Sequence, residues 1–152
     1  MMVPILLGSE KDKEFARKIT KHLDAMEIPF DLQVASAHKV PELVLKIIQK
    51  YNQSTDAVCY ITIAGRSNGL SGVVAANSIH PCLACPPFND KEDLLLNLNS
   101  SVIMPSDTPV LTVIDPQNAA MAAARILALA DKKLREKIKK HIQIIKSSFI
   151  KK

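Results

Sequence analysis

Short apolar runs alternate with amphipathic segments along the first half of the chain. Residues 3–7 form an apolar run that ends at a Gly-Ser pair, and residues 12–26 place apolar side chains at helical spacing. Residues 30–35, preceded by Pro29, form a second predicted strand, and residues 41–51 repeat the helical spacing after a proline suited to a first helical turn. Residues 57–64 are continuously apolar and rich in β-branched side chains, as expected of a strand covered on both faces. The pattern predicts strand, helix, strand, helix and a central strand.

The second half of the chain continues this alternation. It predicts a short helix at 73–76, strands at 82–85 and 110–114, and a helix over the alanine-rich residues 118–130. Residues 131–152 continue as a basic amphipathic helix with one apolar stripe. Strands that alternate with helices in this way build a parallel sheet with right-handed crossovers. We therefore predict an α/β fold, a three-layer α/β/α sandwich with an extra C-terminal helix.

Composition indicates one domain in a reducing environment. The chain has 152 residues, 47% of them hydrophobic, which suits a single core. We predict one domain over residues 1–152, with its core at 1–130 and the C-terminal helix at 131–152. No apolar stretch reaches the roughly 20 residues of a membrane span and no leader precedes the first strand, so a cytoplasmic protein is expected. The three cysteines are too few for a disulfide framework.

The net charge of +5 is concentrated at one end of the chain. Residues 131–152 hold nine Lys or Arg against two acidic residues, a net +7, which leaves −2 for residues 1–130. A basic amphipathic helix is usually a solvated face, and apart from Phe149 this one has no aromatic side chain to stack on a base. No nucleic-acid partner is therefore expected.

Small and polar residues gather in the segments that follow the first three strands. In open parallel sheets, ligands bind outside the carboxyl ends of the strands, so these segments are the expected site. Glycine allows close backbone approach, helix N-termini supply amide donors, and cations can hold a phosphate or carboxylate. The candidate residues are Gly8, Ser9, Asp12, Ser36, Ala37, His38, Lys39, Gly65, Arg66, Ser67, Asn68, Gly69 and Leu70.

These residues also have simpler structural roles, and the sequence lacks the motifs of several other chemistries. Ser9 or Asp12 can be a helix N-cap, His38 can be structural, and glycines also serve tight turns. No P-loop or Rossmann fingerprint follows the first strand, so ATP or NAD use is unsupported. Cys82 and Cys85 have C-x-x-C spacing, but without a second ligand pair neither metal nor redox use is indicated.

Taken in order, the three loops resemble the signatures of the PurE family of purine biosynthesis. Residues 8–12 read Gly-Ser-Glu-Lys-Asp and resemble that family's G-S-x-S-D loop, and residues 36–39 read Ser-Ala-His-Lys and resemble its S-A-H-[RK] loop. Ala64-Gly65 opens the third signature. The resemblance covers nearly all of the chain to about residue 130, and its further matches are Ala84-Cys85-Pro86-Pro87, Met104-Pro105-Ser106 and Asn118-Ala119-Ala120. It implies a flavodoxin-like parallel sheet.

Two branches of that family use different substrates. Residues 64–70 read Ala-Gly-Arg-Ser-Asn-Gly-Leu and, with Lys39, resemble the class II branch of carboxylases that take CO2 directly. The resemblance implies carboxylation of 5-aminoimidazole ribonucleotide to 4-carboxy-5-aminoimidazole ribonucleotide, a carboxy-lyase activity without ATP, biotin or metal. The alternative within the family is N5-carboxyaminoimidazole ribonucleotide mutase. The alternative from another class is a non-catalytic nucleotide- or RNA-binding module.

The resemblance also implies a role for each candidate residue. His38 would take and return the proton of the ring carbon, and Lys39, Arg66 and Ser67 would orient the CO2 or the new carboxylate. Asp12 would accept ribose hydroxyls. Ser9, Ser36 and the backbone near Gly8 would hold the phosphate or carboxylate, with Ala37, Gly65, Asn68, Gly69 and Leu70 lining the site.

Three further expectations follow from the family. Its members are homo-oligomers, tetramers or octamers, and the helices at 118–130 and 131–152 are the expected subunit contacts. Lys11 stands where the family has a second serine, so a cation replaces a hydroxyl. Asp107 stands where a glycine is usual, which affects the backbone of that loop.

Overall fold

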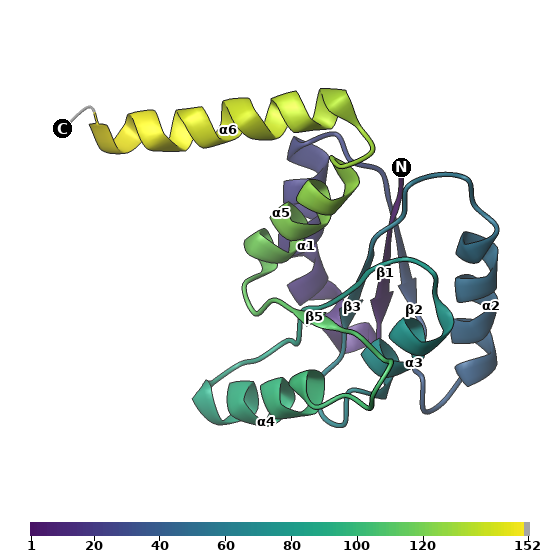
Figure 1. The fold of residues 1–152 in the computed structure, drawn as a ribbon. Helices are drawn as coiled ribbons and strands as arrows, with labels where there is room; N and C mark the ends of the chain where they lie inside the picture. Colours follow the sequence, from purple (N-terminus) through teal and green to yellow (C-terminus); the bar gives the residue numbers. More distant parts are fainter. Residues whose placement is uncertain (151–152) are drawn as a thin grey trace.

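Five parallel strands form the centre of the protein in a computed structural model that describes residues 1–150 (Figure 1). Their order is β2-β1-β3-β4-β5, so β3 is central, as predicted, and the order reverses between β1 and β3. This is the order of flavodoxin-like folds, which bind ligands where the order reverses. The strands are β1 (Val3–Leu7), β2 (Phe30–Val34), β3 (Tyr60–Ile63), β4 (Cys82–Ala84) and β5 (Leu111–Thr112).

Helices cover both faces of the sheet and complete the predicted three layers. In Figure 1, α1 and α5 lie on one face and α2 on the other, where it contacts α3. The 3₁₀ helix η1 (Glu10–Asp12) leads into α1. The helices are α1 (Lys13–Ala25), α2 (Pro41–Asn52), α3 (Gly69–Asn77), α4 (Lys91–Val102), α5 (Pro116–Leu127) and α6 (Lys132–Ile150).

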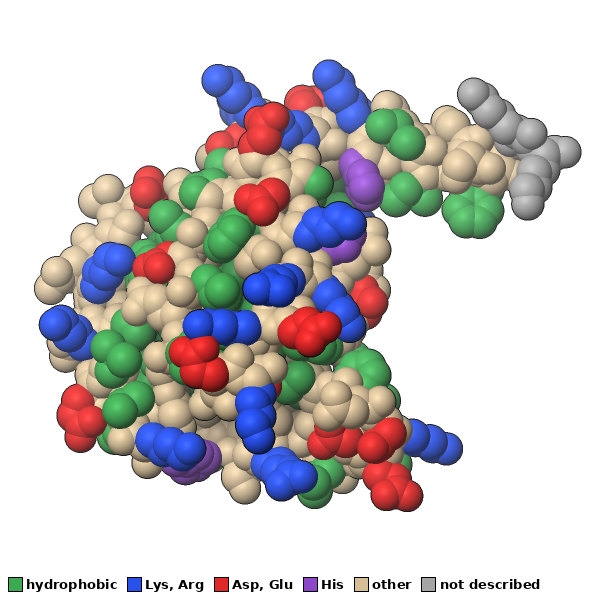
Figure 2. All heavy atoms as spheres, turned by 180° about the vertical axis from the view of Figure 1, so that it is seen from behind, with side chains coloured by type: hydrophobic (Ala, Val, Ile, Leu, Met, Phe, Trp, Pro, Cys, Tyr) green, Lys and Arg blue, Asp and Glu red, His purple; other side chains and the backbone are tan. Residues whose placement is uncertain are grey.

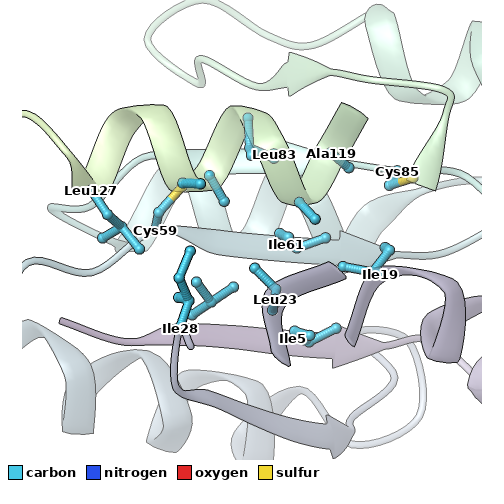
Figure 3. Close-up of a cluster of buried hydrophobic side chains, with 14 of the residues drawn as sticks. Ile5, Ile19, Leu23, Ile28, Cys59, Ile61, Leu83, Cys85, Ala119 and Leu127 are labelled. Atoms are coloured by element: carbon cyan, nitrogen blue, oxygen red, sulfur yellow. The ribbon is translucent and has the colours of Figure 1, made fainter. Parts of the chain in front are cut away.

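Two apolar cores hold these layers together. Ile5 and Ile61 of the sheet pack with Ile19 and Leu23 of α1 and with the alanines of α5 (Figure 3). Those alanines, at 119, 120, 123 and 124, are fully buried. Their small side chains let α5 lie close to α1, so this face of α5 is used within the chain, while the subunit contact expected for residues 118–130 stays a prediction.

Some element boundaries differ from the prediction. The helix expected at 73–76 begins at Gly69, and β5 spans two residues rather than 110–114. The helix expected at 118–130 begins at Pro116 because Asp115 caps it, its Oδ1 accepting from Asn118 N at 2.8 Å. Helix α4 was not predicted at all.

The C-terminal helix is separate from α5 rather than continuous with it. Asp131 Oδ1 accepts from Leu134 N at 2.8 Å and starts a new helix, and Arg135 donates to the carbonyl of Ala128 at the end of α5. Leu134 and Ile138 are buried against the body, whereas the second half of α6 extends beyond it (Figure 1). Lys151 and Lys152, part of the predicted helix, lie outside the described residues. Across residues 1–150, no helix is both long and apolar enough to cross a membrane.

Candidate active site

A cavity of about 1060 Å³ lies beyond the carboxyl ends of β1, β2 and β3. Parallel strands bring their C-terminal loops to one edge of the sheet, which is why three loops far apart in sequence meet there. Most of the candidate residues line it: Gly8, Ser9, Asp12, Ser36, Ala37, His38, Gly65, Arg66, Ser67, Gly69 and Leu70. Lys39 and Asn68 do not line this cavity.

In the loop after β1, Gly8 lies close to the end of β3 and Ser9 caps the helix η1. A Cβ added at Gly8 would lie 3.2 Å from Ala64 Cβ, so glycine lets the ends of β1 and β3 come together. Ser9 Oγ accepts from Lys11 N at 3.3 Å, so Ser9 is the N-cap of η1. Asp12 makes no side-chain cap hydrogen bond. Burial raises the pKa of its carboxyl above 3.8, and a backbone hydrogen bond at Ser9 opposes that shift. A carboxyl perturbed in this way, facing a cavity, is suited to binding a ligand.

The loop after β2 presents His38 to the cavity. The backbone turns here, with Val40 N donating to Ser36 O at 2.9 Å, and the exposed Lys39 falls outside the cavity wall. The His38 ring lies against Gly69, since a Cβ added there would be 3.1 Å from Nε2. This contact joins the second loop to the first turn of α3.

The loop after β3 divides into an exposed half and a buried half. Arg66 and Ser67 are exposed and line the cavity. Asn68 is buried and caps α3, with Oδ1 accepting from Ser71 N at 3.1 Å and Nδ2 donating to Ser101 Oγ at 2.9 Å. Its carboxamide is therefore engaged inside the protein.

Three cations face the cavity without an acidic partner. Within residues 1–150, Lys11, Lys18 and Arg66 belong to none of the ion pairs. The sequence showed Lys11 as a departure from the family motif, but Lys18 was missed; its spacing of seven residues from Lys11, two helical turns, could have revealed it. Unpaired cations beside a helix start favour an anionic ligand.

Sequence reasoning also missed the wall made by α4 and the loop before it. Phe88 from this wall meets Phe15 of α1 edge to face, with ring centroids 6.4 Å apart. Asp93 and Asn97 of α4 also line the cavity. The signal that could have found α4 is Asp90, whose side chain caps it, followed by the acidic first-turn residues Glu92 and Asp93.

The cysteines lie apart from this site. Cys82 packs in the core on the α2 face and Cys85 in the core on the α1 face, so the C-x-x-C pair is split across the sheet. Burial raises the pKa of both thiols to about 12, which keeps them protonated and unreactive. In residues 1–150, no cluster of His, Cys, Asp and Glu is arranged to hold a metal ion.

Comparison with known proteins connects this chain to one family. Residues 2–147 match the sequence-family model described as AIR carboxylase. The phosphoribosylaminoimidazole carboxylase of Archaeoglobus fulgidus is 42% identical over 138 residues, covering 91% of this chain and 75% of that protein. The N5-carboxyaminoimidazole ribonucleotide mutase of Methanocaldococcus jannaschii is 44% identical over 150 residues, covering 93% and 92%. The crystal structure of Treponema denticola PurE superposes with a TM-score of 0.91 at 36% identity, covering 99% of this chain and 94% of that one.

Proposed function

Because the chain belongs to the AIR carboxylase (PurE) family of purine biosynthesis, we propose that it carboxylates 5-aminoimidazole ribonucleotide with CO2. The observation that carries this choice is the loop after β3. It reads Ala-Gly-Arg-Ser-Asn-Gly-Leu over residues 64–70 and presents Arg66 and Ser67 to the cavity that His38 also lines. This loop resembles that of the CO2-dependent branch.

The proposed chemistry needs little more than positioning and one proton transfer. The ring carbon of aminoimidazole is electron-rich because the amino nitrogen conjugates with it, so it can attack the carbon of CO2. The new carbon–carbon bond leaves the ring carbon with both a carboxylate and a hydrogen. His38 removes that proton, and the electron pair of the C–H bond restores the aromatic ring. In the reverse direction His38 returns the proton.

The remaining groups supply charge and orientation. Arg66 and Ser67 are proposed to orient the CO2 and the carboxylate formed from it. Lys11 and Lys18, with the capped start of η1, are proposed to hold the phosphate, and Asp12 to accept the ribose hydroxyls. Lys39, to which the sequence assigned carboxylate orientation, lies outside the cavity wall, so Arg66 is the better candidate for that role.

The second candidate is the mutase reaction, which moves a carboxyl group from the exocyclic nitrogen to the ring carbon. The Methanocaldococcus relative that carries the mutase name is 44% identical, as close as the relatives named carboxylase. Both reactions end with the same proton transfer from the ring carbon, so His38 would serve either one.

An ultraviolet assay separates the two. Purified protein is supplied with aminoimidazole ribonucleotide and bicarbonate without ATP, and in parallel with the N5-carboxy isomer after CO2 is depleted. We expect carboxylated product in the first assay and none in the second. Turnover of the N5-carboxy isomer alone would establish the mutase, and no turnover of either substrate would reject both activities.

A further inference from the structure

The cavity loop after β3 has an unfavourable backbone. Arg66 has φ 22° and Ser67 has φ 52°, so two consecutive residues with side chains lie in the left-handed region. Each such residue costs roughly 1 kcal/mol or more unless the surrounding structure imposes it. The loop therefore needs an anchor outside itself.

That anchor is helix α4, some thirty residues later in the chain. Arg66 N donates to Asn97 Oδ1 at 2.8 Å, and Asn68 N donates to Ser100 Oγ at 3.1 Å. Both acceptors lie on one side of α4, one helical turn apart. The backbone amides on either side of Ser67 are thus held by the same helix.

Asn97 also holds the opposite wall of the cavity. Its Nδ2 donates to Pro87 O at 2.7 Å and to Asp93 Oδ1 at 3.1 Å. Pro87 and Arg66 line the cavity from different loops, so one carboxamide connects two of its walls. Asn97 is only 2% exposed and both its amide hydrogens are used within the protein, so it is placed to orient the loops rather than to bind a ligand.

The fit around Asn97 is close. A Cβ added at Gly65 would lie 3.1 Å from Asn97 Nδ2, so the glycine before Arg66 is what allows the carboxamide to reach the loop. Glycine at 65 and asparagine at 97 therefore form a matched pair.

We propose that Asn97 is a positioning residue for carboxylation: through the backbone of Arg66 it sets where the Arg66 guanidinium meets the reacting CO2 or carboxylate. The inference rests on the proposed function. It extends that function by assigning the geometry of the site to a buried residue on a helix distant in sequence. A guanidinium misplaced by about 1 Å is enough to lower the rate about 100-fold.

The test compares Asn97→Ala with Asn52→Ala. Asn52 is a matched control because its carboxamide also bridges two backbone groups, but it lies away from the cavity. Its Nδ2 donates to Asn77 O, at the end of α3, at 2.8 Å, and its Oδ1 accepts from Ile79 N at 3.2 Å. For Asn97→Ala we expect kcat to fall about 10- to 100-fold with a smaller change in the KM for the ribonucleotide. For Asn52→Ala, kcat should change less than about twofold, even if this variant loses as much free energy of unfolding as Asn97→Ala.

A double-mutant cycle separates positioning from general loosening. If Asn97 acts through Arg66, then Asn97→Ala should have little further effect on kcat in an Arg66→Ala background. Ser100→Ala, which releases the other end of the loop, should also lower kcat, but by less than Asn97→Ala does. This variant replaces Asn97→Ala in the test if Asn97→Ala does not fold.

The outcomes distinguish this inference from the proposed function. Wild-type protein that does not carboxylate the ribonucleotide would reject the proposed function and the inference with it. Two results with an active wild type would overturn the inference alone. The first is a kcat for Asn97→Ala equal to that for Asn52→Ala. The second is that the effects of Asn97→Ala and Arg66→Ala on kcat are additive. If Ser100→Ala is the variant used, kcat equal to the Asn52→Ala value would overturn it in the same way.

Discussion

His38 lies against the first turn of α3, with its ring facing the cavity and packed on Gly69. Replacing His38 with Asn removes the group proposed to exchange the ring proton but keeps a polar side chain. We expect carboxylation to slow by about 10²- to 10⁴-fold while the ribonucleotide still binds. Ultraviolet kinetics together with calorimetric binding check both parts. An unchanged rate in this variant would reject the proton-transfer role.

Asp12 offers a second test at the scale of one residue. Burial raises its pKa in the folded protein above the ordinary 3.8, so ionised Asp12 destabilises the fold at pH 7. Below pH 3.8 the Asp12 carboxyl is mostly protonated in both the folded and the unfolded protein, so the destabilisation by its charge is absent. Asp12→Asn should therefore raise the melting temperature by about 1–3 °C at pH 7 but not at pH 3. The same variant should weaken ribonucleotide binding. Scanning calorimetry showing a lower melting temperature at pH 7 would contradict this.

The sequence located most of the cavity but not all of it. Strand-end residues such as Gly8, His38 and Arg66 were predictable because a parallel sheet brings its carboxyl ends to one edge. Lys39 lies outside the cavity wall because the direction of a side chain in a tight turn depends on the turn itself, which residue order does not specify. Asn97 was invisible because its role exists only once two distant loops meet it.

Helix α4 was not predicted from the sequence because its pattern of buried and exposed residues is unusual. It buries the polar residues Asn97 and Ser101 and exposes Leu95 and Leu96, the reverse of the usual amphipathic helix. Its sequence therefore lacks the apolar periodicity that predicts a helix. The elements that were predicted, such as β1 and α2, bury apolar residues in the ordinary way. The helix that the sequence did not predict is thus the one that lines the cavity and packs through polar residues instead of apolar ones.

The contact between α2 and the edge strand β2 can be tested by removing one hydroxyl. Tyr51 Oη donates to Asp31 Oδ2 at 2.6 Å. Burial of Asp31 opposes its ionisation, but hydrogen bonds from Tyr51, Gln33 and Lys50 outweigh it and lower the pKa of the carboxyl.

We expect Tyr51→Phe to reduce the free energy of unfolding by about 1–2 kcal/mol at pH 7. A lowered folded-state pKa contributes stability above the unfolded value near 3.8, and that stability is lost as pH falls through the lowered pKa. The difference between wild type and variant in urea unfolding should therefore shrink below pH 4. A difference that does not depend on pH would show that lost packing, not the carboxylate, accounts for the effect.

At the scale of the whole molecule, charge and apolar surface are unevenly divided. Figure 2 shows α6 extending past the body with hydrophobic side chains along it. Ile144, Phe149 and Ile150 are mostly exposed there, on the segment of the sequence that holds the excess of basic residues. The expected homo-oligomer stays a prediction, and the exposed second half of α6 belongs to the segment predicted to contact another subunit.

The burial of all three cysteines in the two cores predicts that their thiols react slowly in the native protein. Cys59, Cys82 and Cys85 are buried on opposite faces of the sheet, and burial raises the pKa of each thiol to about 12. At pH 8 almost no thiolate forms in the folded protein, so a disulfide reagent should label none of them within minutes. In denaturant all three should react. Rapid labelling of even one thiol in the native protein would show that a core opens far more easily than its packing implies.

The anchoring of the β3 loop by α4 also bears on when the site is completed during folding. The strands that flank the cavity, β1, β2 and β3, are contained in the first 63 residues, whereas Asn97 and Ser100 follow more than thirty residues later. During synthesis from the N-terminus, the centre of the sheet can therefore pair before the loop has its anchor. A chain released before residue 97 would contain His38 and Arg66 but lack the contact that fixes Arg66 in place. The position of Arg66 in the proposed site is therefore fixed only after α4 has been made and has docked.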